Sequence, residues 1–360
     1  MSYRPILFLV VVLLFANACS RISFKEDVLL GFHYKVVNYE NLEGWEKADI
    51  FSSKAALQKT CKKIFLYDDD ANIKISNIKI KIKNYKKYCL EIIKAKNNSE
   101  LKKTIEKNFY PILMSYKSTK KAHYTGYVEI EVEGSLIKEN EFNVPIYSIP
   151  ANKENSNQIP SRKEIDNSDI YKDFVIAYIK DAVAAYFLHI QGSGRLKLAD
   201  GSYISLSYGG DNGKQYTSIG KILVEEGYIR RENISMQSIQ DWMYKNPIKG
   251  KIIRERNDRY IFFKFRKEGG PLGASGVELT AGHSAAVDKN FIPYHMPIWA
   301  GNLLEENFTS QPNLFVSQDA GSAIKGPMRV DLFLGFGKKS EIIAGSLSKK
   351  YKLWVLVPSH

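Results

Sequence analysis

Short apolar runs separated by glycine and proline make up the chain from Tyr260 to its end. Such a segment is typical of a β-barrel, because short strands joined by tight turns need these residues between them. Within it, Asp331 lies between Val330 and the apolar pair Leu332 and Phe333. This alternation predicts a strand that enters a core, where a carboxyl group loses much of its water.

Asp331 is therefore expected to keep its proton at a higher pH than an ordinary aspartate. Moving an aspartate pKa from about 3.9 to about 6 costs roughly 3 kcal/mol. That cost is usually met at active sites that need an acid near neutral pH. Asp331 is thus the first candidate for a catalytic acid, and Asp319, twelve positions earlier, is its competitor.

Other segments predict strands and a turn in the first two thirds of the chain. From Tyr127 to Glu133, valine and isoleucine alternate with glutamate, which indicates a half-buried strand with one acidic face. The dipeptide Asp200-Gly201 separates runs at 194–198 and 202–208, a composition typical of a tight hairpin.

Apolar periodicity predicts helices over 47–65, 90–109 and 173–188. Ser218 is expected to cap a helix over 219–226, and Ser235 one over 236–244 that ends before Pro247. The stretch 151–168 is rich in Asn, Lys, Ser and Pro and is expected to be a surface loop.

A glycine-rich block runs from residue 192 to residue 213, with glycines at 192, 194, 209, 210 and 213. Glycine lets the backbone approach a ligand closely, and Tyr208 and Tyr216 offer flat faces suited to sugar rings. The alternative is turn chemistry alone, since none of these spacings is a phosphate-loop pattern.

The N-terminus is predicted to carry an export signal. Arg4 precedes an apolar run over 6–15 that is too short to span a bilayer, and Ala16-Asn17-Ala18-Cys19 follows. Small residues before a cysteine resemble a bacterial lipobox, so we expect residues 1–18 to be removed and Cys19 to be lipidated. The alternative is an ordinary secretory cut that leaves Cys19 free.

Length and composition bound the remaining possibilities. A chain of 360 residues with 44% hydrophobic content can bury one large core or two moderate ones, so two domains are expected. The net charge of +13 indicates either a polyanionic partner or compositional drift, and export disfavours nucleic acid. Cys61 and Cys89 form a disulfide or stay as two buried thiols, and no spacing predicts a metal site.

Four ordered blocks resemble the membrane-bound lytic murein transglycosylases of the A type. The first is Thr125-Gly126-Tyr127, in which Glu129 is followed by Ile130 where relatives carry proline, so the strand is expected to continue. The other blocks are 190–194 with 208–213 and 216–220, then 283–288 with Ile292-Pro293, and finally 318–335. The likeness covers the chain from about Thr125 to the C-terminus.

The resemblance implies a mainly β fold with helices: a double-psi β-barrel domain and an inserted second β-barrel domain, with the substrate groove between them. It implies domain A from 19–134 and 246–360, and the murein-binding domain B from 135–245. Ser20 directly after Cys19 resembles the outer-membrane choice of lipoproteins, so we expect attachment to the periplasmic face of the outer membrane through the lipid anchor.

The resemblance further implies a reaction that uses one aspartic acid and no cofactor. Asp331 would protonate the glycosidic oxygen between MurNAc and GlcNAc and then take the proton from the C6 hydroxyl of the same MurNAc, which closes onto C1. Asp319 and Lys325 would support it, and Asp288 is expected to hold a turn. The implied substrate contacts are Thr125, Gly126, Tyr127, Glu129, Gln191, Gly192, Ser193, Gly194, Tyr208, Asn212, Gly213, Tyr216 and Ser218.

Two other functions remain open at this point. One is an aspartyl hydrolase in which Asp319 and Asp331 act as a dyad, and the other is a murein-binding lipoprotein with little turnover. For the lytic transglycosylase, the expected partners are peptidoglycan glycan strands and the membrane, with unspecified cell-wall synthesis or division proteins as further candidates.

Overall fold

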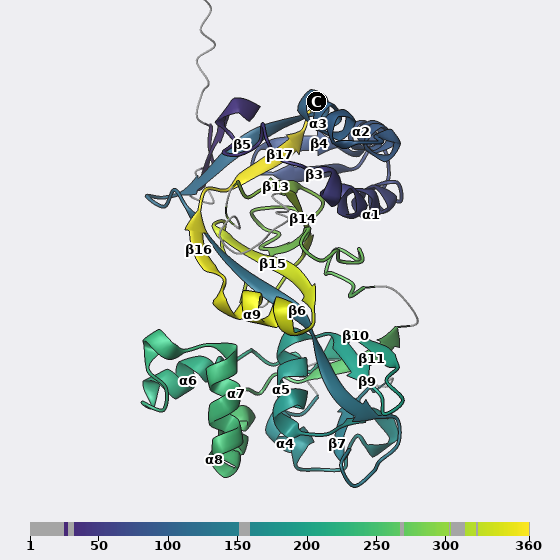
Figure 1. Cartoon of the computed structure of the whole chain (residues 1–360), viewed down its shortest axis with the longest axis vertical. Helices are drawn as coiled ribbons and strands as arrows, with labels where there is room; N and C mark the ends of the chain where they lie inside the picture. Colours follow the sequence, from purple (N-terminus) through teal and green to yellow (C-terminus); the bar gives the residue numbers. More distant parts are fainter. Residues whose placement is uncertain are drawn as a thin grey trace, which may run out of the picture.

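The computed structural model describes residues 25–27, 32–150, 159–266, 270–301, 303, 314–321 and 323–359. The chain forms two sheet-rich bodies, one above the other in Figure 1, and strand β6 (Ala122–Ser135) runs from one into the other. We call the upper one the barrel body and the lower one the inserted body. The mixed α and β fold class predicted from the sequence is confirmed.

The barrel body combines the first and last parts of the chain in one sheet. Its strand order is β1-β2-β5-β17-β13-β14-β12-β15-β6, and β16 pairs with β6. The strands are β1 (Lys25–Asp27), β2 (Phe32–Val36), β5 (Phe109–Tyr116), β12 (Ser284–Val287), β13 (Pro297–Trp299), β14 (Leu314–Asp319), β15 (Arg329–Phe336), β16 (Ser348–Tyr351) and β17 (Trp354–Pro358). Two pairs are parallel, β12 with β14 and β15 with β6.

Three helices and a small hairpin cover one end of this body: α1 (Lys54–Ile64), α2 (Ile82–Lys94), α3 (Asn98–Asn108), β3 (Asn72–Ile75) and β4 (Ile78–Lys81). A disulfide between Cys61 and Cys89 joins α1 to α2. The single helix predicted over 90–109 is wrong, because the Asn97 side chain accepts a hydrogen bond from the Glu100 amide and starts a new helix there.

The inserted body contains β7 (Val144–Tyr147), β8 (Val175–Ile179), β9 (Gly194–Lys197), β10 (Tyr203–Asp211) and β11 (Ile261–Arg266). Its helices are α4 (Arg162–Asp166), α5 (Ala182–Gln191), α6 (Ile219–Glu225), α7 (Met236–Lys245) and α8 (Pro247–Glu255). The predicted hairpin is confirmed, since β9 and β10 pair antiparallel. Ser218 and Ser235 cap α6 and α7 as expected.

Two predictions for this body are wrong. The segment 173–188 does not form one helix: Val175–Ile179 pairs with β7 as a strand, and Asp181 then caps α5. An apolar run of this kind fits either period, and pairing with a neighbouring strand decides the outcome. The predicted loop over 151–168 contains α4, which starts with a capping box between Ser161 and Glu164.

Strand β6 changes partners along its length. Its first part pairs with β15 up to Glu129, and from Ile130 onward it pairs with β9. The strand therefore continues past Ile130, as expected from the missing proline. Because β11 pairs with β10, we propose that the inserted body ends after Arg266 rather than near residue 245.

Helix α9 (Lys338–Ser346) follows β15 and faces the inserted body (Figure 1). Among the described residues, no helix has the length and apolar character needed to cross a bilayer. Residues 1–18 and Cys19, which carry the predicted export signal and lipid attachment site, lie outside the described residues.

Candidate active site

The pairing of β6 with β15 brings the first candidate residues together. Asp331 and Thr125 are direct partners in the parallel register of these strands. The Thr125 hydroxyl donates a hydrogen bond to Oδ1 of Asp331. Asp331 is largely buried, and the residue keeps a small part of its surface exposed.

The environment raises the pKa of Asp331 above its ordinary value. Burial is the main cause, and the negative charge of Asp319 adds to it. The hydrogen bond from Thr125 and the positive charge of Arg329 act in the opposite direction. The direction expected from the sequence is confirmed.

Asp319 ends strand β14 and accepts three hydrogen bonds. The Tyr127 hydroxyl donates to Oδ2 at 2.6 Å, and the amides of Ala274 and Ala320 donate to Oδ1 at 2.8 Å each. Burial raises the pKa of Asp319, while these three bonds lower it. Both of its oxygens are thus held, whereas Asp331 accepts its one side-chain bond from Thr125.

The neighbouring Gln318 fixes the strand that carries Asp319. Its buried amide donates to the carbonyl of Ala56 at 2.9 Å and to Oγ1 of Thr60 at 2.8 Å, and it accepts from Ser284. Helix α1 is thereby connected to β14. This role of Gln318 was not predicted from the sequence, although a glutamine directly before a candidate acid in a buried strand is a usable signal.

Gly273 lies against the same strand. A Cβ atom at this position would be 2.3 Å from the carbonyl oxygen of Gln318, so only glycine allows the chain to pass there. The amide of the next residue, Ala274, then reaches Asp319. This glycine was also missed, because its role depends on a contact with a segment 45 residues away.

Lys325 is exposed and is not among the groups that shift the pKa of either aspartate. The cation that acts on Asp331 is Arg329, two positions before it on β15. Asp288 accepts hydrogen bonds from the amides of Asn290 and Gly326, in keeping with the turn role expected from the sequence.

Glu129 is buried, with 1% of its surface exposed. Its Oε2 accepts a hydrogen bond from Nε of Arg195 at 2.9 Å, and its Oε1 lies 3.7 Å from a guanidinium nitrogen of Arg266. The guanidinium of Arg195 also stacks 3.6 Å from the ring centroid of Phe336. Glu129 therefore holds the junction between the two bodies, and its predicted sugar contact stays a prediction.

The glycine-rich block contains two positions that need glycine for reasons of the fold. Gly192 ends α5 with a φ of +76°. Residues with a side chain rarely adopt this left-handed backbone angle. A Cβ on Gly194 would lie 2.9 Å from the carbonyl oxygen of Ile130. These two glycines satisfy needs of the fold itself. Gln191 and Ser193 beside them are partly exposed, as is Gly126 on β6, and Gly213 is exposed.

Asn212 has no free polar group in its side chain. Its amide nitrogen donates to the carbonyls of Pro160 and Asp258, and its oxygen accepts from the amide of Tyr260. It is completely buried, so it clamps three chain segments together. Tyr208, by contrast, is 47% exposed and remains available for a substrate ring.

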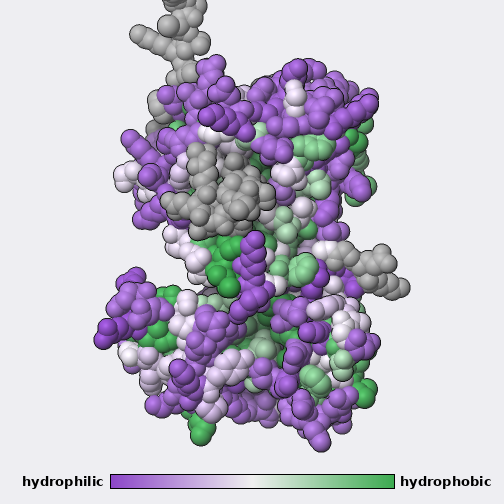
Figure 2. All heavy atoms as spheres, in the orientation of Figure 1, coloured by the Kyte–Doolittle hydropathy of each residue, from purple (hydrophilic) through white to green (hydrophobic). Residues whose placement is uncertain are grey.

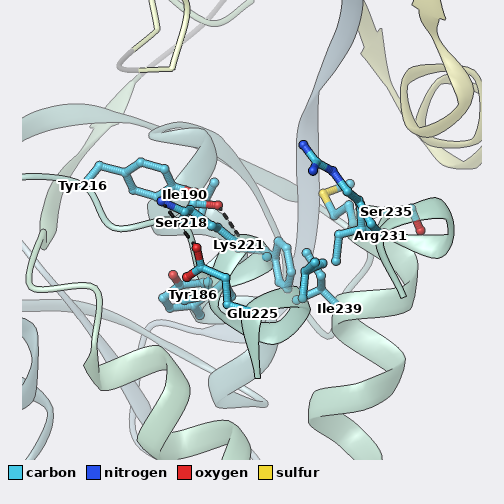
Figure 3. A pocket seen from close by; sticks show the side chains of 15 residues that line it. Tyr186, Ile190, Tyr216, Ser218, Lys221, Glu225, Arg231, Ser235 and Ile239 are labelled. Carbon is cyan, nitrogen blue, oxygen red and sulfur yellow. Dashed lines mark hydrogen bonds and ion pairs between the residues drawn. The ribbon is translucent and has the colours of Figure 1, made fainter. Parts of the chain in front are cut away.

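Tyr216 and Ser218 line a cavity of about 610 Å³ between α5, α6 and α7 (Figure 3). Its walls are largely apolar, and Arg231, Lys221 and Glu225 contribute charge. Ser218 accepts a hydrogen bond from the Lys221 amide as the cap of α6. The structure thus places these two predicted contacts inside the inserted body rather than beside Asp331.

A smaller pocket of about 340 Å³ lies between α9 of the barrel body and α5 and α7 of the inserted body. On the face drawn in Figure 2, the surface is indented between the two bodies and apolar side chains are exposed there. Ile130 and Val132 line this pocket, whereas Thr125 and Tyr127 contact the aspartates. The pocket is therefore lined by the second part of β6, whereas the aspartates are contacted by its first part.

Comparisons with known proteins agree with this architecture. The model of the MltA specific insert domain matches residues 123–264, and the 3D domain model matches residues 283–357. A membrane-bound lytic murein transglycosylase A homolog from Buchnera aphidicola is 32% identical over 321 residues, which cover 81% of this chain and 87% of the relative.

Solved structures show the same fold. A membrane-bound lytic murein transglycosylase from Agrobacterium tumefaciens superposes with a TM-score of 0.78 at 24% identity, over 90% of this chain and 97% of that chain. Escherichia coli MltA with bound chitohexaose gives a TM-score of 0.64 at 26% identity, over 77% of this chain and 83% of that chain.

The two bodies and their shared strand, together with these matches, define an enzyme of the lytic transglycosylase class, which is a lyase class. The chain belongs to the family of membrane-bound lytic murein transglycosylase A.

Proposed function

We propose that this chain cleaves the β-1,4 bond between MurNAc and GlcNAc in peptidoglycan without water and leaves 1,6-anhydroMurNAc ends. Family membership supports the reaction class. The observation that carries the mechanism is Asp331, a partly exposed residue whose carboxyl has a pKa raised by burial. A carboxylic acid of this kind can donate a proton near neutral pH.

In the first step Asp331 protonates the glycosidic oxygen, the bond from C1 of MurNAc to that oxygen breaks, and GlcNAc leaves with a C4 hydroxyl. In the second step the C6 hydroxyl of MurNAc attacks C1, and its proton goes to the carboxylate of Asp331. The acid is thereby restored. An attacking group tethered to the same sugar has a high effective concentration, which explains why no water is needed.

Asp319 has a supporting role in this proposal. Three donors hold its two oxygens, and burial still raises its pKa above the ordinary value. When ionised, Asp319 would stabilise positive charge on the sugar ring in the transition state. Because both of its oxygens already accept hydrogen bonds from protein donors, Asp319 is less free than Asp331 to pass a proton to the substrate. This difference favours Asp331 as the single catalytic acid over the aspartyl dyad considered from the sequence.

We propose the substrate contacts named from the sequence, and the structure supports some of these residues more than others. Escherichia coli MltA was crystallised with chitohexaose, a glycan, which supports a glycan strand as the substrate here. Thr125 and Tyr127 lie at the aspartates, and Tyr208 is exposed.

We further propose that Cys19 is lipidated and holds the enzyme at the periplasmic face of the outer membrane. The relatives are described as membrane-bound, which supports attachment to a membrane. Cell-wall synthesis or division proteins stay as candidate partners.

Mass spectrometry of purified murein digested with the enzyme tests the proposed reaction. We expect glycan fragments that end in 1,6-anhydroMurNAc, with no oxygen from ¹⁸O-labelled water at the new ends. Reducing ends that carry the label would identify a hydrolase instead. Binding to murein without any product would identify a binding protein.

Replacement of Thr125 by valine tests the electrostatics of the site. The change removes a hydrogen bond that lowers the pKa of Asp331, so this pKa rises. Since the acid must be protonated, activity is lost as pH rises through that pKa, and the variant should keep its activity to a higher pH. The pH profile of kcat/KM measures this shift.

Thr125→Ser is the matched control, because it keeps the hydroxyl donor and should leave the alkaline limb in place. A profile for Thr125→Val that does not move, or that moves to lower pH, would contradict the proposed role of Asp331.

A further inference from the structure

The net charge of the chain is concentrated in one part of it. Residues 47–107 contain 16 lysines, no arginine and 7 acidic residues, and thus contribute +9 of the net +13. This segment is about one sixth of the sequence. Compositional drift would spread the excess over the whole chain, so the concentration calls for a local explanation.

The basic segment folds into one layer, formed by α1, α2, α3 and the β3–β4 hairpin. In Figure 1 this layer lies at the end of the barrel body that is far from the inserted body. Helix α2 contacts β17 and α3 contacts β5. The opposite surface of the layer faces away from the sheet.

The outer surface of α2 has a mixed basic and apolar character. Lys83, Lys87 and Lys94 are exposed, and between them Leu90 is 52% exposed and Ile93 is 37% exposed. Residues at spacings of three and four share one side of a helix. We call these five residues the lysine face.

The three lysines of this face have no carboxylate of the described residues within ion-pair distance. Lys59, Lys86 and Lys107 in the same layer do form ion pairs, with acidic residues at 278, 69 and 91. Lys83 and Lys94 act only through space on the carboxylates of Asp69 and Glu91. The lysine face therefore presents exposed positive charge around two apolar side chains. This combination is typical of helices that lie on a membrane surface.

We propose that the lysine face rests on the anionic phospholipid surface to which the enzyme is attached, which presupposes the lipid anchor proposed at Cys19. Lysines close to such a surface are attracted to its negative charge, and Leu90 and Ile93 insert between the headgroups. Acidic peptide stems of murein would satisfy the charge but leave the two apolar side chains in water.

The position of the proposed lipid anchor agrees with contact between the lysine face and the membrane surface. Cys19 precedes Lys25, the first residue of β1, by six residues, and an extended chain of that length spans at most about 20 Å. Strand β1 is two strands from β5, on which α3 packs. Anchor and basic layer therefore belong to the same end of the molecule.

One consequence concerns orientation. With this end on the membrane, the inserted body and its junction with the barrel body point away from the lipid (Figure 1). The proposed reaction would then take place at a set height above the membrane, on the side where the cell wall lies.

Lysine footprinting of the full chain in vesicles tests the proposal. The protein is placed in vesicles of phosphatidylcholine alone or with 30% phosphatidylglycerol, treated with a membrane-impermeant amine reagent and analysed by mass spectrometry. Lys83, Lys87 and Lys94 should react at least threefold more slowly in the anionic vesicles, and 0.5 M NaCl should remove the difference. The exposed lysines Lys138, Lys245 and Lys339 serve as internal controls and should not change.

Equal reactivity of the lysine face in both kinds of vesicle would overturn the proposal. Protection that appears in neutral vesicles only after murein fragments are added would also overturn it and would assign the face to peptide stems.

A triple variant with Lys83, Lys87 and Lys94 replaced by glutamine separates this proposal from the proposed reaction. Its turnover of soluble murein fragments should equal that of the wild type, whereas its salt-dependent protection in anionic vesicles should be lost. A variant with Lys138, Lys245 and Lys339 replaced by glutamine matches the change in net charge and should keep the protection. If the wild type shows no protection in anionic vesicles but still cleaves murein, only the proposed membrane contact is refuted.

Discussion

Replacement of Asp331 by asparagine is expected to lower kcat/KM on purified murein by about 10²- to 10⁴-fold, the range usually lost with a general acid or base. Asparagine has nearly the same shape but can neither donate the proton to the glycosidic oxygen nor take it from the C6 hydroxyl. The rate of release of 1,6-anhydro products measures the effect.

The folding of this variant is expected to remain intact. Because burial raises the pKa of Asp331, the protonated carboxyl is favoured in the native state, and asparagine resembles that neutral form. Asp200→Asn in the exposed hairpin turn is a matched control that should keep full activity. An Asp331→Asn enzyme that folds normally and keeps more than a tenth of the wild-type rate would refute the single-acid mechanism.

Replacement of Cys89 by serine is expected to lower the free energy of unfolding by about 3 to 4 kcal/mol, the value for a closed loop of this size. The disulfide to Cys61 spans 28 residues and joins α1 to α2. Its loss enlarges the set of unfolded conformations that must be restricted on folding. Urea denaturation under oxidising conditions measures the difference.

The double variant Cys61→Ser with Cys89→Ser should be as unstable as the single one, and so should the wild type after reduction. The variant should also lose activity at lower urea concentrations, because Thr60 next to the disulfide holds Gln318 and thereby the strand of Asp319. Equal unfolding midpoints for the oxidised wild type and the variants would show that the disulfide does not stabilise this protein.

Local patterns in the sequence predicted several parts of the fold well. The alternation around Asp331, the hairpin at Asp200-Gly201 and the caps at Ser218 and Ser235 all depend on neighbouring residues. The strand over Val175–Ile179 was mistaken for part of a helix, because its apolar run fits either period and pairing with β7 decided the outcome.

The candidate site was predictable only in part, because some of its contacts join segments that are far apart in the sequence. The sequence indicated Asp331, the raised pKa of its carboxyl and the nearby Asp319, and the family likeness added Thr125. It did not indicate that Gln318 binds α1 across more than 250 residues, or that Gly273 must lack a side chain. Such contacts exist only once distant segments have met.

The shared strand β6 fixes the positions of residues in both bodies. In its first part, Thr125 and Tyr127 donate hydrogen bonds to the aspartates, and in its second part Ile130 pairs with strand β9 of the inserted body. The side-chain period of a strand is two, so losing or gaining a single residue here would turn one set of contacts to the wrong side. We therefore expect the loops of either body to accept a one-residue insertion or deletion, and this strand to reject it.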